Sequence, residues 1–217
     1  MPSDFPRSPR IFKGALVAYQ LPELLPTVIV FQYNPEQLTR SLQPRTASGG
    51  GRGDVNRTDG PPEETISLSV EINAADQLET RDPVTTVVGL HPVLAALEGL
   101  MYPAFPIVVT NQVLSQVGSA IILSEPAPLA LFIWGPARVL PVRVESLSIT
   151  EQAFDTLLNP ILAKADLSLK VLTYRELEIT NPGYWVYMTS FAQKEVMGAL
   201  NLAQTAASAA VSLTLPF

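Results

Sequence analysis

Two segments of the chain alternate cleanly between apolar and polar residues. Between Glu64 and Asn73 every second residue is a large apolar one, and the same period recurs between Ile161 and Tyr174. Successive side chains of a strand point to opposite faces of a sheet, so each segment predicts a half-buried strand. The predicted buried faces consist of Ile66, Leu68, Val70 and Ile72 in the first strand, and of Ala163, Ala165, Leu167, Leu169 and Val171 in the second.

Shorter apolar and β-branched runs predict five more strands. These runs are Phe12–Gln20, Thr27–Tyr33, Leu38–Gln43, Leu129–Trp134 and Val139–Thr150. The last of them is joined to the alternating segment Ile161–Tyr174 by a short polar connection, which indicates a long antiparallel hairpin. The chain of 217 residues contains 20 prolines, and this number favours short strands and frequent turns.

Helices are predicted in two regions. Asp76–Met101 carries apolar residues at helical spacing, and Asp82 before Pro83 is a good N-cap. Ser190–Ser212 is rich in Ala and Leu and predicts a C-terminal helix, whereas Phe105–Leu123 is apolar but fits neither period. The predicted fold class is therefore α+β with β dominant: an antiparallel sheet or barrel with a central helical stretch and a C-terminal helix.

The predicted organisation has three parts. Residues 1–10 form an N-terminal arm, residues 11–189 a β domain, and residues 190–217 the Ala-rich helix and tail. Residues 46–62 are rich in glycine and predict a flexible loop within the β domain. The arm has no apolar core, so it resembles neither a signal peptide nor an anchor. The chain contains no run of about 18 uncharged apolar residues, so we do not expect it to insert into a membrane.

Composition favours a protein that is covered by other subunits. Hydrophobic residues make up 47% of the chain and charged residues 16%, against about 25% charged residues in an average domain. A free monomer of this kind would expose much apolar surface. The net charge of −6 and the scattered Lys and Arg residues argue against binding nucleic acid. The chain has no cysteine, which excludes disulfides and thiolate catalysis and is compatible with the cytoplasm.

Residues that carry catalytic chemistry lack suitable partners. His91 is the only histidine and has no partner residues, so we expect a structural or surface role for it. The acidic pair Glu63–Glu64 has no framing motif, so we expect it to lie on a solvated strand face. The glycine-rich loop lacks the Gly-Lys-Ser/Thr ending of a phosphate-binding loop. We therefore expect that the protein is not an enzyme and has no catalytic, cofactor or metal site.

Two features at the C-terminal end allow more than one interpretation. Tyr184, Trp185 and Tyr187 form an aromatic cluster that favours a core or interface position, with a carbohydrate-binding module as the alternative. The Ala-rich helix is apolar nearly all round, which is typical of a helix covered on more than one side. It either docks on a neighbouring subunit or frays as a tail.

Two motifs, taken together, resemble a known family. Phe31–Arg40 is similar to the F-x-[FY]-N-P-x-x-[LY] signature of the tube-like adaptor proteins of contractile injection systems, which are phage-tail-like particles of the antifeeding-prophage type. Val142–Tyr174 is similar to the V-x-S-L-x-I-x-E-x-x-F-D-x-x-L-N-P-x-x-A hairpin of the same family. The order and spacing of the motifs match over most of Ile11–Tyr174.

The resemblance implies a tail-tube-like β-sandwich or split barrel that forms a ring, and a baseplate-hub adaptor that connects the inner tube to the spike for protein translocation. It implies a homo-oligomer, a hexameric ring, with the inner tube protein, the spike protein and other baseplate subunits as partners. It places the protein in the cytoplasm within an injection particle, with release outside the cell left open. Many relatives carry a LysM module, which this chain does not show. Whether it is the adaptor or a tube-initiating subunit stays open.

The candidate interface residues come from the two motifs, the alternating strand and the aromatic cluster. They are Phe31, Tyr33, Asn34, Pro35, Leu147, Ile149, Phe154, Asn159, Pro160, Leu167, Leu169, Tyr184 and Trp185.

Overall fold

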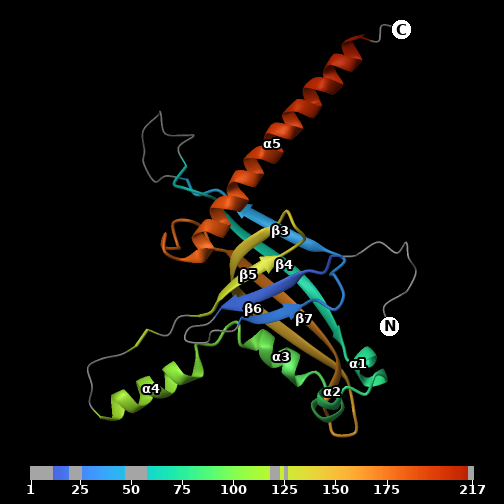
Figure 1. The fold of residues 1–217 in the computed structure, drawn as a ribbon, viewed down its shortest axis with the longest axis vertical. Coiled ribbons are helices and arrows are strands. Elements are labelled where there is room, and N and C mark those ends of the chain that lie inside the picture. The colour runs from blue at the N-terminus through green and yellow to red at the C-terminus, as the bar shows by residue number, and fades with distance from the viewer. Residues whose placement is uncertain (1–11, 20–25, 47–57, 118–122, 125–126, 215–217) are drawn as a thin grey trace.

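A computed structural model describes residues 12–19, 26–46, 58–117, 123–124 and 127–214, with side chains to residue 206. One seven-stranded antiparallel sheet forms its centre, in the order β2-β1-β5-β6-β7-β4-β3 (Figure 1). Five helices accompany the sheet in the described part of the chain, so the predicted β-dominated α+β class is confirmed. The N-terminal arm and residues 47–57 of the glycine-rich loop lie outside the described residues.

All seven predicted strands are present, and their bounds differ from the predictions by a few residues. They are β1 (Ala15–Tyr19), β2 (Thr27–Val30), β3 (Leu38–Gln43), β4 (Glu63–Asn73), β5 (Leu129–Ile133), β6 (Val139–Phe154) and β7 (Pro160–Val171). β2 ends three residues earlier than predicted, because the chain bends from Phe31 towards the Asn34-Pro35 turn.

The predicted long hairpin is the backbone of the fold. β6 and β7 pair from Val142 opposite Val171 to Phe154 opposite Pro160, with a bulge between Val144 and Ser146. β6 continues four residues beyond the predicted end at Thr150. β4 pairs with the other edge of β7 over nine positions. Every predicted inward residue of β4 and β7 is buried, so the alternation was interpreted correctly.

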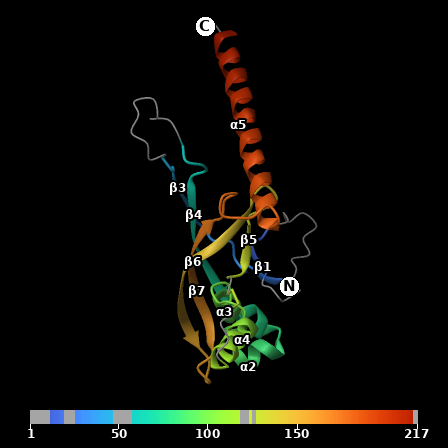
Figure 2. The same ribbon diagram turned by 90° about the vertical axis from the view of Figure 1, so that its left-hand side faces the viewer.

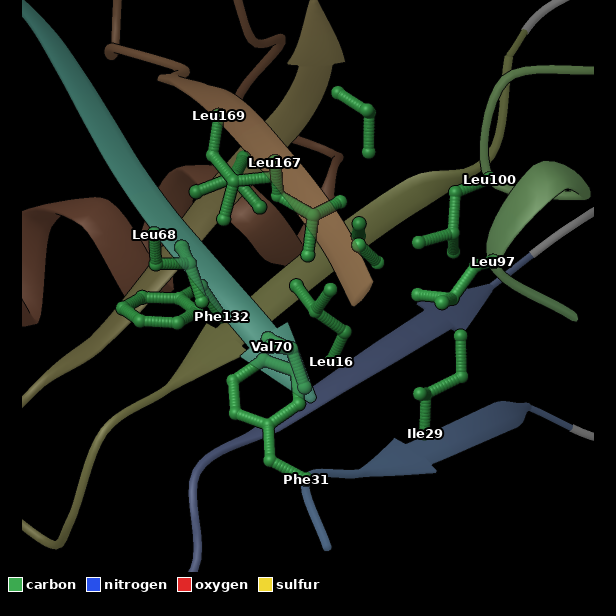
Figure 3. Close-up of a cluster of buried hydrophobic side chains, with 14 of the residues drawn as sticks. Leu16, Ile29, Phe31, Leu68, Val70, Leu97, Leu100, Phe132, Leu167 and Leu169 are labelled. Atoms are coloured by element: carbon green, nitrogen blue, oxygen red, sulfur yellow. The ribbon is translucent and has the colours of Figure 1, made fainter. Parts of the chain in front are cut away.

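The sheet curls around a single hydrophobic core. Side chains from β1 and β2 face those of β4 and β7, and Leu97 and Leu100 close one side of the cluster (Figure 3). Leu16, Phe132 and Leu169 are fully buried at its centre. Burying such side chains stabilises the fold by roughly 1.5–3 kcal/mol each, which explains why the apolar alternation determines the pairing.

The predicted central helical stretch consists of three short helices, α1 (Ala75–Glu79), α2 (Pro83–Val88) and α3 (His91–Glu98). The predicted cap is confirmed, because the carboxylate of Asp82 accepts a hydrogen bond from the backbone N–H of Thr85 at 2.8 Å. The apolar segment that fitted neither period contains a fourth helix, α4 (Phe105–Gln116), which buries none of its residues. None of the described helices is long and apolar enough to span a bilayer.

The C-terminal helix α5 (Pro182–Thr214) has 33 residues and begins eight residues earlier than predicted. Asn181 caps it by accepting the N–H of Gly183 at 2.8 Å, and Pro182 occupies its first turn. The first two turns pack on the sheet, and the remainder projects away from it in both views (Figures 1 and 2). From Phe191 to Ala206 every residue is exposed.

Candidate subunit interface

The first motif forms a turn that fastens the start of β1. The side chain of Asn34 accepts the N–H of Gly14 at 2.9 Å and donates to the carbonyl of Phe12 at 2.8 Å. Phe31 is buried in the core. Tyr33 and Pro35 keep part of their surface and line an open groove with residues of β4 and β7. Phe31 and Asn34, two residues of this motif, therefore have a role inside the chain itself.

The second motif closes the long hairpin. One carboxylate oxygen of Asp155 accepts the backbone N–H groups of Leu157 and Asn159 at 2.7 and 2.8 Å. The side chain of Asn159 donates to the other oxygen at 2.8 Å and to the carbonyl of Val87 in α2 at 3.1 Å. These hydrogen bonds lower the pKa of Asp155, those with Asn159 most. The turn is thus fixed to the helices beside it.

Several predicted interface residues are instead core residues of the chain itself. Phe31, Pro160, Leu167 and Leu169 are buried. They expose almost no surface to a neighbour, so their assignment to the interface needs correction. Their apolar character made them candidates, but a period-2 pattern does not distinguish a face that packs internally from one that packs on another chain.

The remaining candidates keep accessible surface. Tyr33, Asn34, Phe154 and Trp185 are exposed, while Pro35, Leu147, Ile149, Asn159 and Tyr184 are half-buried. Leu147 and Ile149 lie on the outer half of β6, where they pack against the core, and Phe154 lies at the end of the strand beside the hairpin turn. This strand segment therefore carries three of the accessible candidates.

The outer half of β6 has one open edge. β5 pairs with β6 only from Val139 to Val142. Beyond Val142, β6 pairs with β7 alone among the described residues. Alternate residues of the segment Arg143–Phe154 therefore present unpaired backbone N–H and C=O groups along roughly 40 Å, next to the hairpin end (Figure 2). Such an edge is a template for a strand of another chain.

The opposite edge of the unit formed by β6, β7, β4 and β3 is also open among the described residues. β3 is the last strand of the sheet, after β6, β7 and β4. The face of these strands that points away from the core carries polar and charged side chains, among them Glu71, Lys164 and Asp166. Half of the residues that line its shallow groove are serines: Ser67, Ser69, Ser146, Ser148 and Ser168. A sheet face without large apolar residues has little to gain from packing on another protein.

A buried carboxylate that was not predicted as a site anchors α5. Glu64 at the start of β4 accepts a hydrogen bond from Arg40 Nε of β3 at 2.8 Å and one from Lys194 Nζ of α5 at 2.9 Å. Its side chain is only 5% exposed. Burial raises the pKa of Glu64, but the hydrogen bonds and charges of Lys194 and Arg40 outweigh burial and lower it overall.

The expected solvated role of Glu63–Glu64 is therefore correct for one residue and wrong for the other. Glu63 is exposed and pairs with Arg45. Glu64 has the same parity along β4 as Ile66, which is the inward face. This position on the inward face indicates from the sequence that Glu64 is buried. The strand pattern does not indicate that α5 supplies Lys194 as its partner.

The aromatic cluster does not form one flat surface. Tyr187 is buried, and burial raises its pKa. The rings of Tyr184 and Trp185 meet edge to face at 80°. The indole N–H of Trp185 donates to the carbonyl of Ile179 at 3.1 Å. Sugar stacking needs accessible ring faces, and of these three rings only that of Trp185 is exposed.

Among the residues that the structure describes, no three His, Cys, Asp or Glu side chains are grouped so that they could hold a metal ion. His91 lies exposed at the first position of α3.

Comparisons with known proteins add no assignment. No protein-family model matches the chain, and no curated protein matches it.

Proposed function

We propose that this protein is a structural ring subunit of a contractile injection system, a baseplate-hub component that connects the inner tube to the spike. The observation that carries the proposal is the open outer edge of β6 in a four-stranded unit whose other edge, β3, is also open. Joining β3 of one copy to β6 of the next is a head-to-tail contact, and repetition of such a contact closes a ring.

The two open edges lie at different levels along the strands. Leu38, at the start of β3, is level with Leu147 through the pairs with Leu68 and Leu167. The free part of β6 is level with β3 only from Arg143 to Leu147 and extends beyond it to Phe154, so neighbouring copies would be offset along the strand direction. A closed barrel requires such a stagger between its strands.

The polar face of the unit suits the inside of a ring. Five serines line its groove beside other polar residues, and a water-filled channel needs a polar wall that does not bind what passes through it. The motifs at Phe31–Arg40 and Val142–Tyr174 support the same class of particle.

Exposed apolar side chains also support association. On the projecting helices α4 and α5, Phe105, Val113, Leu200 and Leu202 are more than half exposed. Companion subunits in a layered particle would cover such side chains.

Two experiments test the proposal. Mass photometry and negative-stain imaging of the purified full chain, alone and with the products of neighbouring genes, should show rings or their joining to tube and spike proteins. A well-folded monomer at every concentration that joins none of those products would contradict it.

A further inference from the structure

A groove runs along one side of α5 where the helix leaves the sheet. Two adjoining hollows form this groove, and Ser190 and Gln193 of α5 line both of them. The larger hollow, of about 440 Å³, falls within the size range of pockets that bury a ligand. The apolar side chains that line the groove are Trp134, Val139, Leu140, Trp185, Val186 and Met197.

The charged groups of this groove are cationic. Arg40, Arg138 and Lys194 line the larger hollow, and no Asp or Glu among the described residues lines either hollow. Arg40 and Lys194 share the carboxylate of the buried Glu64. The half-buried side chain of Arg138 forms no hydrogen bond or ion pair with any described residue. Three cations around one carboxylate leave an excess of positive charge in a chain whose net charge is −6, so the groove favours a negatively charged partner.

The end of the β6–β7 hairpin has the complementary character. Phe154, Leu157 and Leu158 are 49%, 73% and 78% exposed there. Residues 144–163 of the hairpin include acidic residues and no Lys or Arg. The acidic residues are Glu145, Glu151 and Asp155. An exposed apolar tip beside carboxylates therefore matches an apolar groove beside cations.

Hydrogen bonds hold the hairpin end in one shape. The carboxylate of Asp155 accepts hydrogen bonds across the turn, and Asn159 fastens the turn to the carbonyl of Val87 in α2. Ala153 and Leu158 have φ of 48° and 66°, which residues other than glycine rarely adopt. Such strain persists where the surrounding structure imposes it, commonly at binding sites. A projection of fixed shape loses little conformational entropy when it docks.

The groove and the hairpin end lie at opposite ends of β6. Val139, the first residue of the strand, lines the groove, and Phe154, its last residue, belongs to the hairpin end. A strand of 16 residues spans roughly 50 Å, and α5 and the hairpin end lie at opposite ends of the molecule in both views (Figures 1 and 2). The two surfaces of one chain therefore cannot meet, whereas those of two copies can.

We infer that the hairpin end of one copy, residues 151–158, docks in the groove beside α5 of a second copy. The contact is head to tail along the strands, so its repetition extends into a stack. It goes beyond the proposed function, in which β3 and β6 join side by side. It also leaves that joint free, because residues 151–158 lie beyond the part of β6 that is level with β3. A chain that forms rings would thus also stack them in layers.

Charge reversal tests the inference, because each copy supplies both a groove and a hairpin end. Arg138→Glu and Glu151→Lys, made separately in the full chain, each set like charges against one another at the contact. Sedimentation velocity of either variant alone should show association weakened by roughly tenfold or more. In an equimolar mixture of the two variants every groove finds an oppositely charged hairpin end, so association should return to the wild-type level, and this recovery also shows that both variants are folded.

Two further variants serve as controls for the charge reversal. Glu36→Lys, at an exposed position outside both surfaces, changes the net charge as Glu151→Lys does and should associate like wild type. Leu157→Ser removes an exposed side chain from the hairpin end without changing charge. It should keep the wild-type melting temperature and weaken association by a factor similar to that of the charge reversals.

A wild-type chain that does not associate end to end, or a mixture that associates no better than the separate variants, would overturn the inference. Negative-stain imaging of the same samples reports ring formation separately. Single rings in every sample, with no stacks of wild type, would refute the docking and leave the proposed function standing. Association that recovers on mixing, without any rings, would refute the ring and retain the docking.

Discussion

Glu64 and Lys194, 130 residues apart in the chain, form an ion pair in which Nζ and Oε2 are 2.9 Å apart. Arg40 binds the other oxygen of the same carboxylate. The pair therefore joins three elements, β3, β4 and α5, at the point where α5 leaves the sheet. The carboxylate is buried and the ammonium is nearly half exposed. We therefore expect the loss of the Glu64 carboxylate to destabilise the protein more than the loss of the Lys194 ammonium.

We predict that Glu64→Gln lowers the free energy of unfolding by about 1–3 kcal/mol, because it leaves two cations without their buried partner. Urea denaturation monitored by the fluorescence of Trp134 and Trp185 measures the change. Glu63→Gln is the matched control. It breaks the exposed pair with Arg45, and such pairs contribute at most about 1 kcal/mol. Equal losses in the two variants would show that Glu64 is not an anchor.

Acid should weaken the protein partly through the same residue. The pKa of Glu64 is lowered from its ordinary value of 4.5, so folding favours the ionised form. A group with a lowered pKa contributes stability that is present above its unfolded pKa and lost as the pH falls through the folded pKa. The wild-type melting temperature should therefore fall on acidification below about pH 5, and it should fall less steeply in Glu64→Gln.

The comparison of wild type with Glu64→Gln isolates the effect of Glu64, because the other acidic residues remain in both proteins. The pKa values of Glu176, Asp82 and Asp155 are also lowered, mainly by hydrogen bonds that outweigh burial in each case. They should give both proteins the same residual acid sensitivity. Parallel curves of melting temperature against pH for wild type and Glu64→Gln would contradict the assignment.

The sequence predicted the sheet well because its information is local. Alternation over Glu64–Asn73 and Ile161–Tyr174 identifies inward residues without any knowledge of their partners. The sequence also predicted the hairpin of Val139–Thr150 with Ile161–Tyr174, because only a short polar connection separates these two strands. The strand order, however, depends on which edges meet after the sheet has curled, and no local pattern specifies that.

The candidate interface was harder to predict for the same reason. Leu167 and Ile149 have similar residue types, yet one is buried in the chain's core and the other is half-buried on the open half of β6. Exposure depends on where β5 stops pairing with β6. The start of α5 was missed as well, although Asn181-Pro182 is a recognisable helix start, because the aromatic residues after it were interpreted as a separate cluster.

The open edge of β6 can be tested with two neighbouring prolines. Thr150 and Glu151 are both exposed and pair with Lys164 and Ala163 of β7. Successive N–H groups of a strand point to opposite edges, so one of the two substitutions to Pro removes a hydrogen bond to β7 and the other removes an N–H from the open edge. We expect Thr150→Pro and Glu151→Pro to differ in melting temperature by several degrees.

The more stable of the two proline variants should fold normally and fail to form rings in mass photometry, because it cannot donate to a neighbouring strand. The less stable variant reports the cost of the intramolecular hydrogen bond, about 1 kcal/mol. Rings of normal size from the more stable variant would show that this edge is not used.

Two glycines, Gly89 and Gly198, should respond in opposite ways to substitution by alanine. Gly89 has φ of 57° after α2, and a Cβ there would lie 2.6 Å from the carbonyl oxygen of Pro160 at the hairpin end. Gly198 lies within α5, where a Cβ would meet nothing within 4 Å. Gly89→Ala should lower the free energy of unfolding by about 1–3 kcal/mol through backbone strain and this contact. Gly198→Ala should leave it unchanged or raise it by up to about 1 kcal/mol, because alanine favours the helix.

Chemical denaturation of both variants measures these effects, and helix content from circular dichroism supplies a second measure for Gly198→Ala. The Gly89 variant also tests whether α2 and the end of the β6–β7 hairpin are held together, because relief of the contact requires them to separate. If Gly89→Ala were as stable as wild type, the close approach of Gly89 to Pro160 would be wrong, and with it the fixed position of the hairpin end beside the helices.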